Sequence, residues 1–191
     1  MLIPRPETEH VIETALTTGA RRMVDIGTGS GAIAVTLSLE TGGHVIATDV
    51  STGALNVAKG NAARLGASVD FVACDLASAL RGPFDLMVSN PPYVPSSESL
   101  PREVRDFEPG IALYGGEDGL AVYRRLIPEA ARLLRPGGWL ILELAYNAAD
   151  RVRGMLEGWE QVRVIPDLAG LPRVIEASVP TGKFVTKLKP L

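Results

Sequence analysis

The residues with the most specific chemistry in this sequence are Asn90, Pro91, Pro92 and Tyr93, which directly follow an apolar, strand-like run. Consecutive prolines fix the backbone and leave carbonyl groups without competing N–H donors. Asn90 adds a side-chain carbonyl, and Tyr93 adds a flat ring. Two acceptors and an aromatic face suit a planar –NH₂ group, so the motif predicts a site for an amide or an exocyclic amine. A plain proline turn is the alternative, and it is the weaker interpretation beside the features below.

A glycine-rich turn lies closer to the N-terminus. Gly27, Gly29 and Gly31 follow a short apolar run and precede a helical pattern, so a ligand could approach the backbone and a helix N-terminus closely. The spacing differs from the dinucleotide pattern G-x-G-x-x-G, and a tight structural turn would also explain it. Asp25, just before the turn, would suit a cationic ligand with an amino group and would repel a pyrophosphate. This charge favours S-adenosylmethionine over a dinucleotide.

Two further carboxylates end the next two strand-like runs. Asp49 follows the glycine turn by about 20 residues, where a carboxylate can accept both hydroxyls of a ribose. Its alternative role is to cap the helix that begins near Ser51, although Ser51 could do this alone. Asp75 could bind the amino group of adenine while Leu76 packs against the ring; a solvated loop residue is the alternative for Asp75.

These residues need elements that bring them together, and the hydrophobic pattern supplies alternating strands and helices. Because such alternation is typical of a parallel sheet covered on both faces, we expect an α/β fold with an antiparallel hairpin at its C-terminal edge. In open sheets of this kind, ligands bind outside the carboxyl ends of the strands. The irregular segment 94–116 is long enough for a lid or binding loop. We expect strands at 22–26, 44–49, 69–73, 84–89, 139–144, 159–165 and 173–178, helices at 7–16, 32–39, 51–65, 118–134 and 148–156, and a turn at 135–138.

Composition limits the class of protein. The chain has 191 residues, 46% of them hydrophobic, with a formal net charge of −3, so one globular domain is expected and a partner bound mainly through its phosphates is disfavoured. One cysteine, Cys74, cannot form an internal disulfide, and we interpret it as a small buried side chain. No apolar run is long enough for a membrane helix, and the N-terminus does not resemble a signal peptide. We therefore expect a cytoplasmic protein.

The motifs, taken in order, carry a resemblance. Asp25 to Gly31, Asp49 and Asn90 to Tyr93 resemble a class I S-adenosylmethionine-dependent methyltransferase that acts on an exocyclic or amide nitrogen. The segments 3–9, 108–120 and 167–174 are similar to the HemK/PrmC family, the methyltransferases of glutamine in peptide-chain release factors. This resemblance extends from residue 3 to about residue 177.

The resemblance implies a Rossmann-like, seven-stranded sheet with strand order 3-2-1-4-5-7-6, one catalytic domain over residues 1–191, and no metal. It also implies that Asn90 to Tyr93 bind the substrate amide, with Asn90 and Pro91 as the catalytic residues. The family usually carries an N-terminal helical domain that helps to hold the release factor, and we expect it to be absent here. The residues implied to bind S-adenosylmethionine, and its product S-adenosylhomocysteine, are Asp25, Gly27, Thr28, Gly29, Ser30, Gly31, Asp49, Asp75, Leu76 and Asn90.

For function, the resemblance implies methyl transfer to the side-chain amide nitrogen of a glutamine, in the Gly-Gly-Gln motif of release factors. We hypothesise that Asn90 and the Pro91 carbonyl bind both amide hydrogens and aim the nitrogen at the donor methyl group, without a strong base. His10 and His44 are then structural. The expected partner is a protein substrate, with no membrane and a monomer favoured.

Three other functions stay open at this point. An adenine methyltransferase of nucleic acid would use the same amine site on a flipped base, but the net charge and the two loop arginines, Arg102 and Arg105, provide no phosphate track. A non-catalytic module that binds the methyl donor is the second alternative, and an intact Asn90 to Tyr93 argues against it. A dinucleotide-dependent oxidoreductase is the third. Glu143 begins a segment, 143–147, that departs from the usual family pattern.

Overall fold

Seven strands form one sheet in the computed structural model, which describes residues 7–102 and 108–182. The strand order is β3-β2-β1-β4-β5-β7-β6, and β7 is antiparallel to both of its neighbours while the other pairs are parallel. This confirms the expected fold class and strand order. The strands are β1 Arg22–Ile26, β2 His44–Asp49, β3 Val69–Ala73, β4 Phe84–Ser89, β5 Leu134–Glu143, β6 Glu160–Pro166 and β7 Pro172–Ser178.

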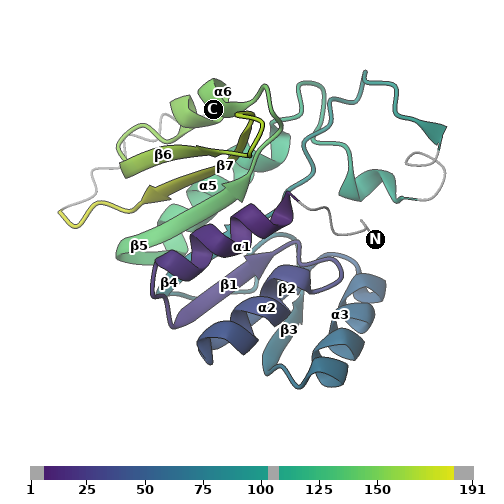
Figure 1. Cartoon of the computed structure of the whole chain (residues 1–191), viewed down its shortest axis with the longest axis vertical. Helices are drawn as coiled ribbons and strands as arrows, with labels where there is room; N and C mark the ends of the chain where they lie inside the picture. Colours follow the sequence, from purple (N-terminus) through teal and green to yellow (C-terminus); the bar gives the residue numbers. More distant parts are fainter. Residues whose placement is uncertain (1–6, 103–107, 183–191) are drawn as a thin grey trace.

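Helices cover the two faces of the sheet (Figure 1). On one face lie α1 (Thr8–Thr17) and α2 (Ala32–Thr41), with α3 (Thr52–Leu65) packed beside α2. On the other face lie α5 (Ala121–Leu133) and α6 (Ala149–Met155). A short 3-10 helix, η1 (Gly110–Ala112), lies in the excursion between β4 and α5. In the described residues, no helix is long and apolar enough to cross a membrane.

The central strands are apolar on both sides because each side faces a different core. Met23 of β1 packs in the core beneath α1 and α2, whereas its neighbour Val24 packs in the core beneath α5 and α6. Leu86 and Met87 of β4 divide between the two cores in the same way. Successive side chains of a strand point to opposite faces, so nearly continuous apolar runs are what a strand covered on both faces requires.

Helix α5 begins later than the sequence predicts. We expected helix from residue 118, but α5 starts at Ala121 because Gly116 and Gly119 have φ of +86° and +75° and cannot continue a right-handed helix. The Asp118 carboxylate accepts a hydrogen bond from the Leu120 N–H at 3.1 Å, which stabilises a turn in place of the first helical residues.

Strand β5 is also longer than expected, because the predicted turn at residues 135–138 lies inside it. The pairing of β5 with β4 shifts register between Phe84 and Leu86, which marks a bulge opposite these residues. Gly137 has a φ of +71°, and its N–H donates to the Val179 carbonyl at 2.8 Å. The bulged segment therefore has a hydrogen-bond partner in Val179, directly after β7, whose N–H also donates to the Gly138 carbonyl at 2.9 Å. Residues 3–6 of the family-like N-terminal segment and Arg105 of the long loop lie outside the described residues.

Candidate active site

A cavity of about 540 Å³ lies at the carboxyl ends of the central strands. This volume is within the range of small-molecule sites, roughly 300–1,000 Å³. The four strand ends selected from the sequence, at Gly27, Asp49, Asp75 and Asn90, all line it. The full lining comprises Thr8, Ile26, Gly27, Thr28, Gly29, Ser30, Ala32, Ile33, Asp49, Val50, Ser51, Ala54, Asp75, Leu76, Ser89, Asn90, Pro91, Pro92, Pro109, Ile111, Ala112, Val122 and Arg125.

The glycine turn after β1 is both tight and open. Gly27 has a φ of +71°, and a Cβ added there would meet nothing within 4 Å. Glycine is therefore favoured here by the left-handed backbone conformation and not by a lack of space for a side chain. Gly31, with a φ of +83°, is the N-cap of α2, and its Cβ would lie 3.0 Å from the Cβ of Ala58 in α3. The Thr28 N–H donates to the Thr48 carbonyl at 2.8 Å, which ties the turn to β2. Gly27 thus opens toward the cavity, while Gly31 lets two helices approach.

Asp49 connects the glycine turn to the next loop. Its Oδ2 accepts from the Gly29 N–H at 2.9 Å, and its Oδ1 accepts from the Ser51 N–H at 2.8 Å. The capping role falls to Ser51, whose side chain accepts from the Ala54 N–H at 3.2 Å. Each carboxylate oxygen has a second lone pair, so Asp49 keeps acceptors for ligand hydroxyls while it holds both loops.

The Asp75–Leu76 corner combines an unusual backbone with an ion pair. Leu76 has a φ of +48°, and its carbonyl accepts from the Thr48 hydroxyl at 2.8 Å. A non-glycine residue in this conformation is uncommon and often lies at a functional site. Asp75 pairs with Arg125 from α5, and about half of each side chain is exposed. The corner therefore offers an apolar side chain and a carboxylate to the same end of the cavity.

Asn90 and the two prolines that follow it line the cavity at the end of β4. In the sheet, β4 lies on the other side of β1 from β2 and β3, the strands that lead to Asp49 and Asp75. The Asn90 side chain donates from Nδ2 to the Thr8 hydroxyl at 3.2 Å. Tyr93 does not line this cavity. It lines a neighbouring one of about 110 Å³, together with Arg173, and its hydroxyl donates to Glu143 Oε1 at 3.4 Å. Burial, reinforced by the Glu143 charge, raises the pKa of Tyr93 to about 12, so the phenol keeps its proton.

Asp25 lies behind the glycine turn and does not line the cavity. It is 1% exposed, and its Oδ2 accepts from the Thr28 hydroxyl at 2.6 Å. Burial raises the pKa of Asp25 to about 7, against the lowering effect of the Thr28 hydrogen bond. Gly31 does not line the cavity either. The donor-binding roles of Asp25 and Gly31 and the substrate-binding role of Tyr93 stay predictions, as do the roles predicted for the residues that line the cavity. In the structure Asp25 accepts a hydrogen bond from Thr28 and so supports the glycine turn.

Several lining residues were not selected from the sequence. Arg125 lies on α5, and no local pattern distinguishes it from the other charged residues of that helix. Ile111 belongs to η1 within a segment without periodicity. Thr8 was part of a family-like segment, but its hydroxyl was given no role. The contact between Thr8 and Asn90 joins residues that are 82 positions apart in the chain.

The seven-stranded sheet with this cavity at its carboxyl edge defines a class I S-adenosylmethionine-dependent methyltransferase. The methyltransferase small domain family model matches residues 7–106. A release factor glutamine methyltransferase of Koribacter versatilis is 46% identical over 95% of this chain and 68% of its own, and one of Bradyrhizobium diazoefficiens is 48% identical over 92% and 64%. The chain belongs to this family of release factor glutamine methyltransferases, and it spans about two thirds of the length of these relatives.

Solved structures agree on the fold. A methyltransferase from Pyrococcus furiosus has a TM-score of 0.73 at 23% identity, over 94% of this chain and 85% of its own. An RNA methyltransferase from Salinibacter ruber in complex with S-adenosylhomocysteine has a TM-score of 0.64 at 18% identity, over 96% of each chain. At these identities, the likeness extends to the fold alone.

Proposed function

We propose that this protein transfers a methyl group from S-adenosylmethionine to the side-chain amide nitrogen of a glutamine in peptide-chain release factors, within their Gly-Gly-Gln motif. The observation that carries the proposal is that Asn90 and Pro91 both line the cavity of about 540 Å³, where their carbonyl groups would accept the hydrogens of a substrate amide. The naming of the relatives supports the choice of substrate.

The residues present fit S-adenosylmethionine. Asp49 has acceptors for the ribose hydroxyls, Leu76 and Val50 provide apolar surface for the adenine, and the open glycine turn accommodates the amino-acid part. Among the described residues that line the cavity, two carry carboxylates, Asp49 and Asp75, and one is basic, Arg125, which is paired with Asp75. This balance suits a cationic, phosphate-free ligand better than a pyrophosphate. When bound, S-adenosylmethionine supplies an electrophilic methyl group.

The protein's part is to hold and orient the substrate amide. An amide nitrogen is a poor nucleophile because its lone pair is delocalised into its carbonyl. Acceptance of both N–H groups, by Asn90 Oδ1 and the Pro91 carbonyl, would favour charge on the nitrogen and fix its direction. Orientation of this kind can contribute up to roughly 7–11 kcal/mol. No strong base is needed, since the methylated nitrogen is acidic enough to lose its proton to water.

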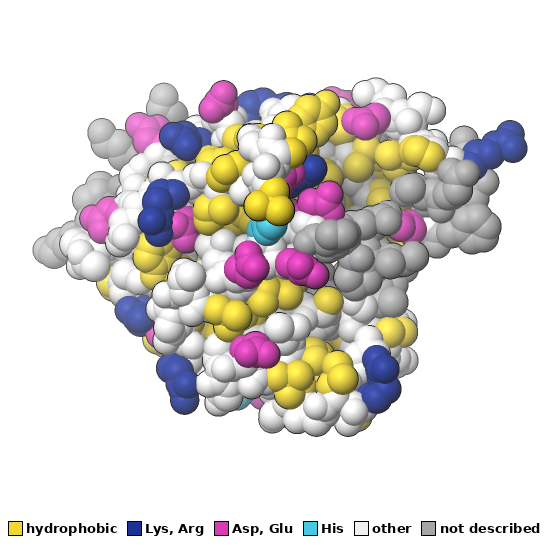
Figure 2. All heavy atoms as spheres, in the orientation of Figure 1, with side chains coloured by type: hydrophobic (Ala, Val, Ile, Leu, Met, Phe, Trp, Pro, Cys, Tyr) yellow, Lys and Arg dark blue, Asp and Glu magenta, His cyan; other side chains and the backbone are white. Residues whose placement is uncertain are grey.

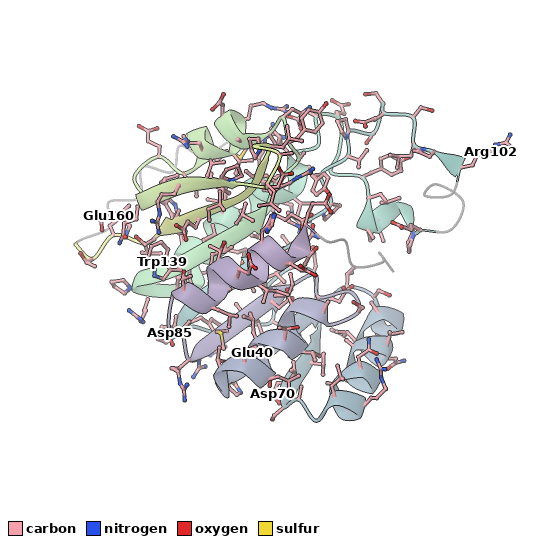
Figure 3. All side chains as sticks on the ribbon, viewed as in Figure 1. Glu40, Asp70, Asp85, Arg102, Trp139 and Glu160 are labelled. Atoms are coloured by element: carbon pink, nitrogen blue, oxygen red, sulfur yellow. The ribbon has the colours of Figure 1, made fainter. Side chains whose placement is uncertain are left out.

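A protein substrate agrees better with the surface than a nucleic acid does. Lys and Arg side chains on the face in Figure 2 are separated from one another and do not form one continuous track. Arg102 points outward from the tip of the excursion after β4 (Figure 3). The net charge is −3, and binding to a phosphate backbone requires clustered cations. We also propose that the described sheet and helices form one catalytic domain that works as a monomer in the cytoplasm, where release factors act.

Replacement of Asn90 by alanine tests the proposed role of its amide. We expect turnover to fall about 100- to 1,000-fold, the cost of one orienting hydrogen-bond partner in the transition state. The affinity for S-adenosylhomocysteine, measured by calorimetry, should change far less, because the other lining residues persist. Asn56→Ala on the exposed side of α3 is the matched control. Turnover at the wild-type rate in Asn90→Ala would contradict the proposal.

A further inference from the structure

Behind Asn90 lies a short chain of hydrogen bonds that leads into the protein. Asn90 Nδ2 donates to Thr8 Oγ1 at 3.2 Å, and Thr8 Oγ1 donates to Glu143 Oε2 at 2.9 Å. Glu143 is 2% exposed and Thr8 is 6% exposed. The Tyr93 hydroxyl donates to the other carboxylate oxygen, Oε1, at 3.4 Å. Asn90, which would bind the substrate amide, is thus connected through Thr8 to a buried carboxyl group at the end of β5.

The scaffold fixes Glu143 on several sides. Its own backbone carbonyl accepts from the Tyr123 hydroxyl of α5 at 2.7 Å, which holds the last residue of β5 in place. Thr8 is the first residue of α1, so the N-terminus of that helix brings the hydroxyl between the other two side chains. Two other charged side chains influence the pKa of this carboxyl group: Glu7, just before α1, raises it, and Arg173 of β7 lowers it. Glu7 and Arg173 also form an ion pair with each other at 3.7 Å.

The direction of these hydrogen bonds decides which end of the Asn90 amide faces the cavity. An ionised carboxylate can only accept hydrogen bonds. Thr8 must then give its single hydroxyl hydrogen to Glu143, and it can only accept from Asn90. The nitrogen end of the Asn90 amide is therefore directed at Thr8, and its oxygen, Oδ1, is left for the substrate. An oxygen is the acceptor that a substrate –NH₂ group requires.

A protonated Glu143 would reverse the direction of these hydrogen bonds. Its hydroxyl could donate to Thr8, whose hydrogen would then turn toward Asn90 and would need the amide oxygen as its acceptor. The amide of Asn90 would present Nδ2 to the cavity, where two donors would face each other. The assignment of amide oxygen and nitrogen follows from the surrounding network, and here the network depends on one proton.

We propose that Glu143 and Thr8 are positioning residues, which act through Asn90 by fixing the acceptor end of its amide toward the substrate. This inference rests on the proposed function of the same site. It also assigns a use to Glu143, which the methyl-transfer chemistry itself does not employ.

The proposal predicts an acid limb in the pH profile of turnover. Burial raises the pKa of Glu143 and the charge of Glu7 adds to this, whereas the hydrogen bonds from Thr8 and Tyr93 and the charge of Arg173 oppose it. The net direction is upward, so activity should fall with acidity at a higher pH than an ordinary glutamate would give. Glu143→Gln cannot ionise, and we expect the limb assigned to Glu143 to disappear.

Thr8 allows a nearly isosteric test. Thr8→Val keeps the shape of the side chain but removes the hydroxyl, and we expect a tenfold or larger fall in kcat with a much smaller change in the affinity for S-adenosylhomocysteine. Thr8→Ser restores the hydroxyl and should recover most of the lost turnover. A purely structural role for Thr8 would lower stability and leave kcat and its pH profile unchanged, so that result would overturn the proposal.

A second readout needs no substrate. The chain contains four asparagines, Asn56, Asn61, Asn90 and Asn147, so their side-chain amide signals can be assigned by NMR after selective labelling. We expect the Asn90 signals to shift with pH in the wild type, to lose this shift in Thr8→Val and Glu143→Gln, and the exposed Asn56 signals to stay constant throughout. Asn90 signals that do not change with pH in the wild type would refute the proposed positioning role of Glu143 and Thr8. Signals that titrate in a wild-type protein unable to methylate release factors would refute the proposed function instead.

Discussion

Replacement of Asp49 by asparagine removes one carboxylate oxygen from a position where both oxygens are in use. Oδ2 accepts from the Gly29 N–H at 2.9 Å and Oδ1 from the Ser51 N–H at 2.8 Å. Asparagine has one acceptor oxygen, so it can serve one of these N–H groups, and its own –NH₂ group would face the other. It also loses the negative charge that makes both bonds charge-assisted.

The cost to ligand binding can be estimated from the bonds that this carboxylate would make to the ribose, because its bonds to Gly29 and Ser51 are internal to the protein. A hydrogen bond to a charged group contributes about 1.5–3 kcal/mol, and in Asp49→Asn the ribose hydroxyls would lose one charged acceptor. At about 1.4 kcal/mol per tenfold, we expect the affinity for S-adenosylhomocysteine to fall roughly 10- to 100-fold. Calorimetric titration measures this directly. The free energy of unfolding should change less, because an N–H group at the solvated edge of the cavity can donate to water once its carboxylate acceptor is lost.

The matched control is Asp70→Asn. Asp70 lies on β3 away from the cavity lining, and its exposed carboxylate pairs with His44 at 2.8 Å (Figure 3). An exposed pair of this kind contributes little, so we expect wild-type affinity in this variant. Equal affinities in Asp49→Asn, Asp70→Asn and the wild type would show that Asp49 does not contact the ligand and would refute the reasoning.

Two further predictions concern stability. Gly27→Ala should cost about 1 kcal/mol for its left-handed backbone, whereas Gly31→Ala should cost more because its Cβ would also press on Ala58 at 3.0 Å; equal urea midpoints for the two variants would contradict this packing account. Asp25 has a folded-state pKa of about 7, above its ordinary value of 3.8, so the stability it contributes is present below about pH 4 and is lost as the pH rises through 7. Over this window the loss is on the order of 4 kcal/mol, and denaturation curves of Asp25→Asn between pH 4 and 8 should lack this part of the slope.

Local patterns predicted β1, β2 and β4 well because each is a mostly apolar run of five or six residues that ends at, or just before, a glycine or polar residue. The run before Gly27 and the run before Asn90 are examples, and both strands were found at the predicted bounds. Since parallel strands place their carboxyl ends at one edge, the residues after them were also brought together as expected. Ser51 was identified as a helix cap from its residue type and position alone.

The errors and omissions arise where distant contacts decide the structure. The bulge at residues 135–138 resembles a turn locally, and it becomes part of β5 because Gly137 pairs with Val179. The bond between Thr8 and Glu143 joins positions 135 residues apart, so no spacing in the sequence could indicate it. Arg125 reaches the cavity because α5 packs across the sheet, which local composition does not reveal.

The most direct test of the central claim is methylation of a full-length release factor. Purified protein would be incubated with isotopically labelled S-adenosylmethionine and the unmethylated factor, and the peptide that contains Gly-Gly-Gln would be analysed by mass spectrometry. We predict one labelled methyl group on the side-chain nitrogen of that glutamine, present with the wild type and strongly reduced with Asn90→Ala. A label found on another residue, or on nucleic acid under the same conditions while the glutamine stays unmodified, would contradict the account.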